Sequence, residues 1–558
     1  MTLPSQIQTA VSQQAITKVT RLFNGSIGDI LAELLQNARR AGAGAVSIEM
    51  IRDGDRSMLR VRDNGTGITD PRDFVTLGQS GWDRGIADRE DPAGMGAFSL
   101  AGRRVEVRSR PAQAPDGWRI VVNPDDWETS SPIAVERDEI AKGTTITFDL
   151  PEAWTNNLAG AITRAAAYYP LDVYFNGEPQ PRRDWLKDAV HVEEWNGTRL
   201  GVIRAGRTAA RFHHVNFHGV TVPCPLPTIG ETGRGRIWSV LVDIVDAPDL
   251  QLVLPARKEM VQNAALDELQ LACKRAIYRA IAQQPAHRLT FENWCEAKDL
   301  GVELPEADAY LSGWLPPTND SGSLQVGEAV RDVPMLIMPD LDPDVANSAA
   351  RALGDGKALG ANIVLEEPCL AGYSWYDKIP KIADVQFMVD IGNQTYKLFE
   401  DEKPTPGEIK TGRVQDIRLR LSFEDEIRPV SYVPTDMLVI DDDAFGVLED
   451  TIILLTEDAT ITVGQLTELL QNAVFNDSDD HDADSYETQE QQFRAYAKEI
   501  AMTLLLGEDQ AILSRIEDLL AREAVFLGRD GRTISITLAD GKATARYVDA
   551  GTAEPALT

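Results

Sequence analysis

Apolar and polar residues repeat with a helical period between Ile27 and Ala45, a stretch that reads IGDILAELLQNARRAGAGA. The apolar positions recur at steps of three and four residues, which is typical of a helix with one buried face. Gly42 and Gly44 follow, and glycine commonly ends a helix because it tolerates positive φ. We therefore predict an amphipathic helix whose buried stripe consists of Ile27, Ile30, Leu31, Leu34, Ala38 and Ala41.

A polar stripe runs beside the apolar one and contains Glu33, Asn37 and Arg40. Glu33 and Asn37 are four residues apart, so they lie one turn apart on the same face of the helix. A pair of this kind, taken alone, is more typical of a solvated helix face than of a site.

Two glycine-containing segments follow the helix. In LRVRDNGTGI (Leu59 to Ile68), a predicted strand ends at Asp63, and Gly65 and Gly67 give the next residues a permissive backbone. In AGMGAFSLAG (Ala93 to Gly102), glycines precede a short helical run, whose first N–H groups are a natural seat for phosphate. The residues of interest in this second segment are Gly94, Met95, Gly96 and Ser99.

A further segment, GTTITFDLP (Gly143 to Pro151), reads as a strand that opens with Gly143-Thr144. Each segment alone has ordinary explanations. Together, in this order and spacing, they resemble the Bergerat-type ATP-binding fold of the GHKL superfamily, which comprises DNA gyrase, the ninety-kilodalton heat-shock chaperones, sensor histidine kinases and MutL. The resemblance implies an α/β sandwich over residues 1–151, with helices on one face of a mixed sheet.

The resemblance also implies ATP and Mg²⁺ as ligands. It makes Glu33 the general base or the residue that orients the attacking water, and Asn37 a ligand of Mg²⁺ held against the phosphates. It implies that Asp63 accepts a hydrogen bond from the exocyclic amine of adenine.

The remaining roles concern the base and the phosphates. Gly65 and Gly67 would let the backbone approach adenine, and Thr144 would close the adenine pocket. The phosphate contacts would come from the segment with Gly94, Met95, Gly96 and Ser99.

Three features depart from the pattern of the superfamily. Arg40 stands where the chaperones and MutL usually carry an acidic residue, and Asp91 replaces a glycine common in the chaperones. The segment 69–93, which by resemblance is a lid over ATP, has no obvious phosphate-binding lysine, and Arg84 is the nearest candidate. ATP binding is therefore better supported than turnover.

A second domain, similar to the transducer or middle domain of these ATPases, is predicted over 152–300. Its segment Leu254 to Gln262 resembles the end of the chaperones' catalytic loop, where a cation reaches the γ-phosphate. Lys258 is the position that matches best. The alternative is a basic residue that flanks the long helix predicted to follow.

Three histidines lie close together in FHHVNFH: His213, His214 and His218, near Cys224. If this segment is one strand, His214 and His218 face the same side, as a metal site requires. No carboxylate partner is evident, so we favour a strand of mixed exposure.

The other predicted elements complete the two domains. A helix is predicted over 5–23 and another over Ala159–Tyr169, and Gly201–Arg204, His213–Val222 and Arg236–Val245 are predicted strands of the second domain. The strands of the first domain are predicted at Ala45–Arg52, Ser57–Arg62, Arg104–Arg110, Trp118–Val122 and Thr144–Leu150.

The C-terminal half matches no family by its motifs. Residues 305–440 read as a β-rich mixed domain, and 441–558 as a helical region with an acidic loop and a terminal hairpin. Helices are predicted from Val463, over Glu490–Leu506 and over Asp509–Ala524, and the hairpin pairs Arg532–Leu538 with Ala543–Val548. The fold class of the whole chain is therefore mixed, α/β and α+β.

Composition bounds the environment and the partners. The chain has 558 residues and a formal charge of −32, which disfavours general nucleic-acid binding but is compatible with one local basic groove. The four cysteines are scattered, and the chain shows neither a signal peptide nor a run of about 18 apolar residues. We expect a cytoplasmic protein without membrane contact.

Two functional classes compete at this point. A chaperone-like ATPase switch with a protein client or partner fits the domain order and the acidic charge, and a homodimer stays open. A MutL-like or MORC-like DNA clamp fits ELLQNARRAGA equally well. A nucleotide-gated binding module without turnover is the third alternative. A histidine kinase is disfavoured because only about 26 residues precede the Glu33 helix, too few for a phospho-acceptor helix.

Overall fold

The computed structural model describes residues 26–54, 56–76, 81–82, 99–129, 131–205, 215–233, 235–253, 259–318, 326–354, 359–399, 408–425, 427–441, 448–477, 484–523, 533–539 and 541–548. The chain divides into two compact units, Met1–Asp308 and Ala309–Thr558. Both units are mixed α/β, as predicted. Within the described residues, no helix is long and apolar enough to cross a membrane.

The first sheet contains eight described strands in the order β5-β4-β3-β6-β2-β1-β7-β8. β1 and β2, both predicted as strands, form a hairpin that turns at Gly54 with a φ of 60°. Neighbouring strands are antiparallel except for β1 and β7, which are parallel. The strands are β1 (Ala45–Asp53), β2 (Arg56–Asp63), β3 (Val105–Arg110), β4 (Gly117–Val122), β5 (Glu136–Asp138), β6 (Gly143–Asp149), β7 (Asp172–Phe175) and β8 (Glu178–Pro179).

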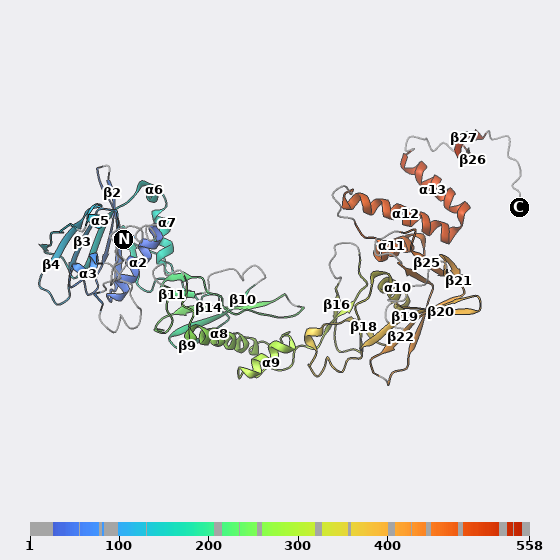
Figure 1. The fold of residues 1–558 in the computed structure, drawn as a ribbon, viewed down its shortest axis with the longest axis horizontal. Helices are drawn as coiled ribbons and strands as arrows, with labels where there is room; N and C mark the ends of the chain where they lie inside the picture. The colour runs from blue at the N-terminus through green and yellow to red at the C-terminus, as the bar shows by residue number, and fades with distance from the viewer. Residues whose placement is uncertain are drawn as a thin grey trace, which may run out of the picture. The chain divides into compact units, whose positions relative to one another are not determined.

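The predicted amphipathic helix is α2 (Ile27–Arg40), and all six residues of its apolar stripe are buried. Its N-terminus is capped by Ser26, whose Oγ accepts a hydrogen bond from the backbone N–H of Asp29 at 3.2 Å. α2 and α7 (Leu158–Ala166) pack against the sheet in one hydrophobic core (Figure 1). The remaining helices of this part are α3 (Arg72–Val75), α5 (Asp126–Thr129) and α6 (Glu152–Thr155).

This sheet and its core extend beyond Pro151, the predicted end of the first domain. Leu158 and Ile162 of α7 belong to the same core as α2, and so does Val173 of β7. The pairing of β7 with β1 places a segment expected in the second domain inside the first sheet.

The second sheet has the order β12-β11-β14-β10-β9, with β13 paired to β14. α8 (Ala264–Ala282) contributes its apolar side to the core on this sheet, and α9 (Phe291–Asp299), which we did not predict, follows it. The strands are β9 (His191–Trp195), β10 (Thr198–Ala205), β11 (Val215–Phe217), β12 (Val220–Val222), β13 (Ile229–Gly230) and β14 (Ile237–Ile244).

The prediction of one strand over His213–Val222 was wrong. β11 ends at Phe217, and His218 lies in the turn before β12 with a φ of 51°. His218 therefore does not belong to a strand face shared with His214, and His213 and His214 lie outside the described residues. Within the described part of the chain, no three His, Cys, Asp or Glu side chains are grouped as a metal site.

Among the described residues, the second unit contains three larger sheets, with orders β16-β15-β18-β17, β20-β19-β22-β23 and β21-β25-β24, and the two-stranded sheet of the terminal hairpin. α10 (Pro343–Leu353) packs among these strands and was not predicted. The strands are β15 (Leu311–Trp314), β16 (Val326–Val330), β17 (Met335–Met338), β18 (Asn362–Leu365), β19 (Ile382–Ile391), β20 (Gln394–Phe399), β21 (Gly412–Val414), β22 (Asp416–Phe423), β23 (Ser431–Thr435), β24 (Met437–Ile440) and β25 (Ile452–Thr456), and a 3₁₀ turn spans Pro368–Leu370.

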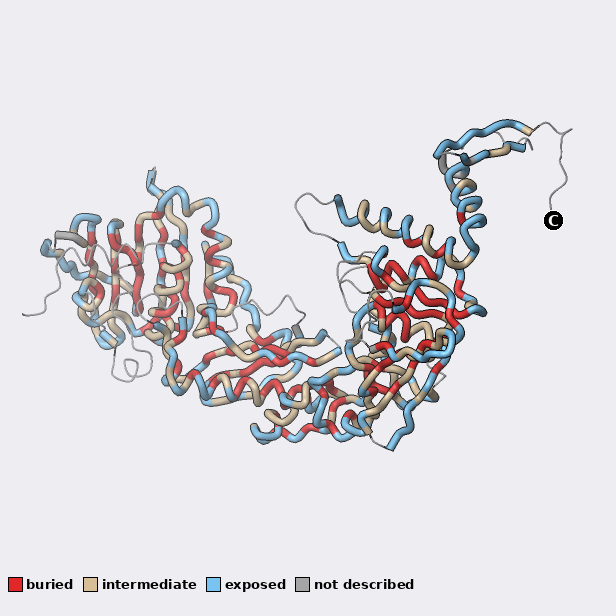
Figure 2. The backbone as a smooth tube through the Cα atoms, turned by 45° about the vertical axis from the view of Figure 1, so that its right-hand side comes forward, coloured by how far each residue is buried: buried red, intermediate tan, exposed pale blue. Residues whose placement is uncertain are grey.

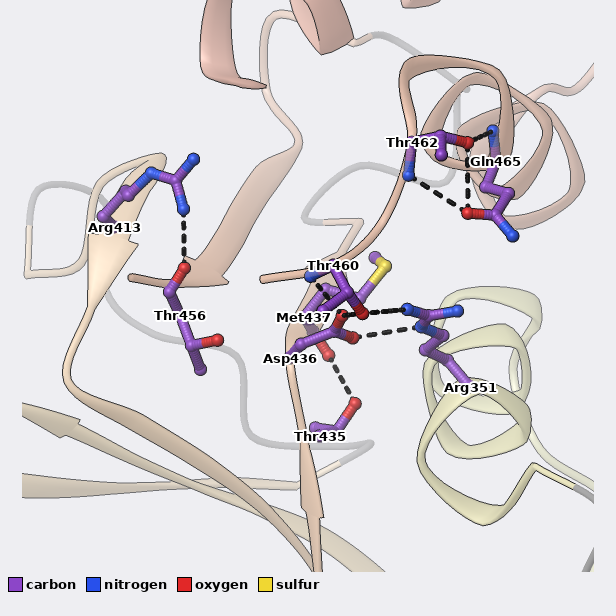
Figure 3. A network of polar contacts seen from close by, with 9 residues as sticks. All are labelled: Arg351, Arg413, Thr435, Asp436, Met437, Thr456, Thr460, Thr462 and Gln465. Carbon is purple, nitrogen blue, oxygen red and sulfur yellow. Dashed lines mark hydrogen bonds and ion pairs between the residues drawn. The ribbon is translucent and has the colours of Figure 1, made fainter. Parts of the chain in front are cut away.

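Asp436 organises a polar network between β23 and β24 (Figure 3). Arg351 of α10 donates to both carboxylate oxygens, from Nε at 3.0 Å and from Nη2 at 2.8 Å. The backbone N–H and the hydroxyl of Thr460 donate to Oδ2 at 3.0 and 3.1 Å. These four bonds hold the pKa of Asp436 well below its usual range, at about 2.

The chain ends in helices and a hairpin, close to the prediction: α11 (Val463–Val474), α12 (Tyr486–Leu506), α13 (Glu508–Glu523), β26 (Thr533–Ala539) and β27 (Lys542–Val548). α11 begins with a capping box between Thr462 and Gln465 (Figure 3). Figure 2 shows the terminal hairpin almost entirely exposed, in contrast to the buried strands of both units.

Candidate nucleotide-binding site

Asp63 is the last residue of β2, a strand inside the first sheet. The register places it opposite Val46 of β1 and opposite Thr144 of β6. Its Oδ1 accepts a hydrogen bond from the backbone N–H of Gly65 at 2.8 Å, which fixes the carboxylate in the turn after the strand. The sheet thus brings together two predicted site residues, Asp63 and Thr144, that are far apart in the sequence.

Burial raises the pKa of Asp63 to about 6, although the backbone N–H groups of Gly65 and Thr144 oppose this shift. Among the described residues, no cation and no side-chain donor contacts this carboxylate. A half-buried carboxylate of this kind gains from an added N–H donor, because hydrogen bonds stabilise the ionised form. The exocyclic amine of a purine is such a donor.

Gly65 and Gly67 pack closely against neighbouring protein atoms. A Cβ at Gly65 would lie 2.6 Å from the Cβ of Ala41, and a Cβ at Gly67, where φ is 75°, would lie 2.3 Å from the carbonyl oxygen of Arg110. The glycines therefore let the turn after Asp63 close against α2 and β3. Their expected approach to adenine stays a prediction.

Ser109 is a buried residue of this region that sequence reasoning missed. Its Oγ lies 3.1 Å from the hydroxyl of Thr144, and it accepts from the N–H of Ile68 at 2.8 Å. It therefore joins β3, β6 and the turn after β2. The sequence offers no signal for it, because a serine on a strand is ordinary until its cross-strand partner is known.

The turn after Asp63 is bonded to the C-terminal end of α2. The N–H of Thr66 donates to the carbonyl of Ala41 at 2.8 Å, and the side chain of Asn64 accepts from the N–H of Gly44 at 2.7 Å. Asn37 lies one turn before Ala41, whose N–H donates to the Asn37 carbonyl. The helix end and the strand end thus form one local unit.

Arg40 contacts Asn37 directly, since its Nη1 donates to Asn37 Oδ1 at 3.3 Å. An amide oxygen has two lone pairs, so one stays available to a cation. Asn37 supplies a single oxygen, whereas Mg²⁺ takes six ligands and keeps several waters. These residues therefore fit a Mg²⁺ that arrives with nucleotide phosphates, rather than a metal held by the protein alone.

Of the other predicted site residues, the structure describes Glu33 and Ser99. Glu33 lies on α2 one turn before Asn37 and is half-buried. Ser99 is buried, with 3% of its surface exposed. The remaining predicted residues of the phosphate segment, the lid and the second domain lie outside the described residues: Gly94, Met95, Gly96, Arg84, Asp91 and Lys258.

The family comparison agrees with this geometry. Residues 25–153 match the family described as histidine kinase-, DNA gyrase B-, and HSP90-like ATPase. This segment is a domain of that ATPase family. Its match to the ATPase domain supports ATP binding and a nucleotide-dependent switch.

Among solved structures, the Aquifex aeolicus MutL ATPase domain complexed with ADP is similar to this chain, with 16% identity, 39% of this chain and 92% of that chain covered, and a TM-score of 0.25. No curated protein matches this chain.

Proposed function

We propose that the ATPase domain binds Mg-ATP and hydrolyses it slowly, so that the protein works as a nucleotide-driven conformational switch. The observation that carries this proposal is the Asp63 carboxylate at the end of β2, half-buried, opposite Thr144 and with its pKa raised to about 6. Apart from backbone N–H groups, this carboxylate has no hydrogen-bond donor among the described residues, and it lies where the resemblance places adenine.

In the proposed reaction, water attacks the γ-phosphorus of ATP, and the bond to the β,γ-bridging oxygen breaks to release ADP and phosphate. Glu33 orients this water and takes its proton. Asn37 supplies one oxygen to the Mg²⁺ that accompanies the phosphates. Lys258 of the second domain is the proposed cation at the γ-phosphate.

The switch has a physical path, because α2 also contacts the chain beyond residue 153. The hydroxyl of Tyr169 donates to the carbonyl of Leu35, and Nε2 of Gln36 donates to the carbonyl of His218 at 2.8 Å. Leu35 and Gln36 directly precede Asn37. A displacement of α2 on nucleotide binding would therefore shift Tyr169 and the β11–β12 turn through these hydrogen bonds.

We assign the switch to a chaperone-like ATPase that acts on a protein client in the cytoplasm. The strongly acidic composition, with a formal charge of −32, supports this over a DNA clamp. The clamp is the second candidate because ELLQNARRAGA resembles MutL as much as the chaperones. Duplex DNA that stimulates phosphate release at low salt, and ceases to do so at high salt, would favour the clamp.

The test is calorimetric titration of Mg-ATP into wild type and Asp63→Ala, with phosphate release measured on both and on Glu33→Ala. We expect wild type to bind, Asp63→Ala to lose binding, and Glu33→Ala to bind without turnover. If wild type binds ATP but releases no phosphate, the result favours a nucleotide-gated binding module without turnover. Wild type that does not bind ATP would refute the proposal.

A further inference from the structure

A cavity of about 750 Å³ lies where the end of the first sheet region meets the second sheet. It contains none of the predicted nucleotide contacts. Its volume suits one small organic ligand. The side chains that decide its chemistry are Arg39, Arg182, Arg183, Arg199, Trp185 and His218.

The charge of this lining is opposite to that of the chain. Four arginines line the cavity, against two aspartates, Asp184 and Asp243. Both aspartates are engaged within the protein: Asp243 accepts from Asn216 at 2.8 Å and from Arg199 at 3.4 Å, and Asp184 accepts from the N–H of Leu186 at 3.1 Å. In a protein of formal charge −32, this is a local basic site.

Arg182 and Arg183 supply most of the uncompensated charge. Both are exposed, and among the described residues neither guanidinium forms an ion pair. Arg183 is held in place through its backbone, whose N–H donates to the carbonyl of Ala167 at 2.6 Å. Two arginines that are consecutive in the sequence and both line the cavity can each present a fork of N–H donors to an anion bound there.

Trp185 adds an independent observation. Its Nε1 is buried and has no hydrogen-bond partner in the described part of the chain, although a buried indole N–H normally has one. The ring is fixed against Tyr168, edge to face, with centroids 4.7 Å apart and planes at 88°. The cavity lining thus holds a fixed ring whose donor is unsatisfied.

We propose that this cavity binds a small molecule that carries its negative charge on phosphate groups. The arginine forks match phosphate oxygens, and the volume admits a compact polyanion rather than a nucleic-acid duplex. The ligand would neutralise a basic lining that the aspartates compensate only in part.

The cavity is also connected to α2. Arg39 donates from Nε to Oε1 of Gln36 at 3.2 Å, and Gln36 donates to the carbonyl of His218 at 2.8 Å. An anion that draws Arg39 toward the cavity would pull on Gln36, which directly precedes Asn37. This effect on the nucleotide rests on the proposed function, whereas binding of the anion does not.

The experiment is calorimetric titration of pyrophosphate into the full chain, with a non-hydrolysable ATP analogue and Mg²⁺ present at saturation to fill the nucleotide site. The test variant is Arg182→Gln with Arg183→Gln. The matched control is Arg60→Gln with Arg137→Gln, which also removes two exposed arginines but lies on β2 and β5. Thermal unfolding of all three proteins confirms that they fold.

We expect wild type and the control to bind pyrophosphate with dissociation constants within twofold of each other, and the test variant to bind at least tenfold more weakly. Pyrophosphate should also change tryptophan emission in wild type and not in Trp185→Phe. Absence of binding in wild type, or equal weakening in the control, would overturn the inference. Citrate that binds as tightly at equal ionic strength would overturn the assignment to phosphate.

The two proposals fail separately. If Mg-ATP binds in a manner that depends on Asp63 but pyrophosphate does not bind, only the proposal of a cavity ligand is refuted. If pyrophosphate binds in a manner that depends on Arg182 and Arg183 but the protein does not bind ATP, only the proposed ATPase function is refuted.

Discussion

The guanidinium of Arg40 lies on the side chain of Asn37, with Nη1 3.3 Å from Oδ1. This oxygen is the one that the resemblance to GHKL ATPases assigns to Mg²⁺, and Arg40 stands where the chaperones and MutL usually carry an acid. A cation therefore occupies one lone pair of the proposed metal ligand and adds a positive charge beside the metal.

Arg40→Met should lower the Mg²⁺ concentration that gives half-maximal ATP binding, by about three- to tenfold, because a repulsion of about 1 kcal/mol is removed. Calorimetric titration of ATP at a series of Mg²⁺ concentrations measures this, with Arg60→Met as the control for loss of one charge. Weaker ATP binding with an unchanged Mg²⁺ requirement would instead place Arg40 on the phosphates.

Asp63→Asn should abolish ATP binding and yet stabilise the empty protein at neutral pH. The folded pKa of Asp63, about 6, exceeds its ordinary value of 3.8, so the folded protein holds more protons than the unfolded chain between these values. Stability is therefore lost as pH rises through this window, by at most about 3 kcal/mol.

Thermal unfolding of wild type, Asp63→Asn and the exposed control Asp53→Asn, from pH 4 to pH 8, tests this. The difference between wild type and Asp63→Asn should grow from near zero at pH 4 to its full size above pH 6. A difference that does not depend on pH would show that the carboxylate is well solvated in the folded protein.

Asp436→Asn should destabilise the second unit by about 2 kcal/mol at pH 7, since it breaks the paired bonds to Arg351. The pKa of Asp436 is lowered from 3.8 to about 2. Its contribution is therefore fully present above pH 3.8 and is lost as pH falls toward 2. Urea unfolding at pH 7 and pH 3 measures this, with the more exposed pair of Asp425 and Arg428 as the control through Asp425→Asn. Equal effects of both substitutions at pH 7 would contradict the prediction.

Gly67→Ala should destabilise the ATPase domain by about 1–3 kcal/mol more than Gly102→Ala. Both glycines have similar positive φ, 75° and 77°, but a Cβ at Gly67 meets the carbonyl of Arg110 at 2.3 Å, whereas a Cβ at Gly102 has no neighbour within 4 Å. The shared backbone strain cancels in the comparison, which leaves the cost of crowding. Calorimetric unfolding of both variants decides it, and equal loss would mean that the turn after Asp63 yields easily.

The sequence predicted the elements whose signals are local. α2 follows from its apolar period, and the β1–β2 hairpin follows from Asp53-Gly54-Asp55 between two strands. The hydrogen bonds of α2 at Leu35 and Gln36 were missed because their partners, Tyr169 and His218, lie more than a hundred residues away along the chain.

The sequence identified candidate site residues but did not predict which of them lie next to each other in the fold. Asp63 and Thr144 were assigned by resemblance, but their pairing across β2 and β6 depends on a long-range register that periodicity does not encode. Ser109 was missed for the same reason. The turn at His218 was missed because nothing in the alternating pattern of this segment indicates that a histidine adopts the left-handed backbone conformation.

The parallel pairing of β7 with β1 has a practical consequence. A fragment cut at residue 153, where the family match ends, would leave β1 with unpaired backbone N–H and C=O groups along the side that Asp172–Phe175 covers. It would also lack α7, which shares the core with α2. An exposed edge next to an opened core is a template for strand addition. The minimal autonomous nucleotide-binding fragment of this chain therefore extends to at least Pro179.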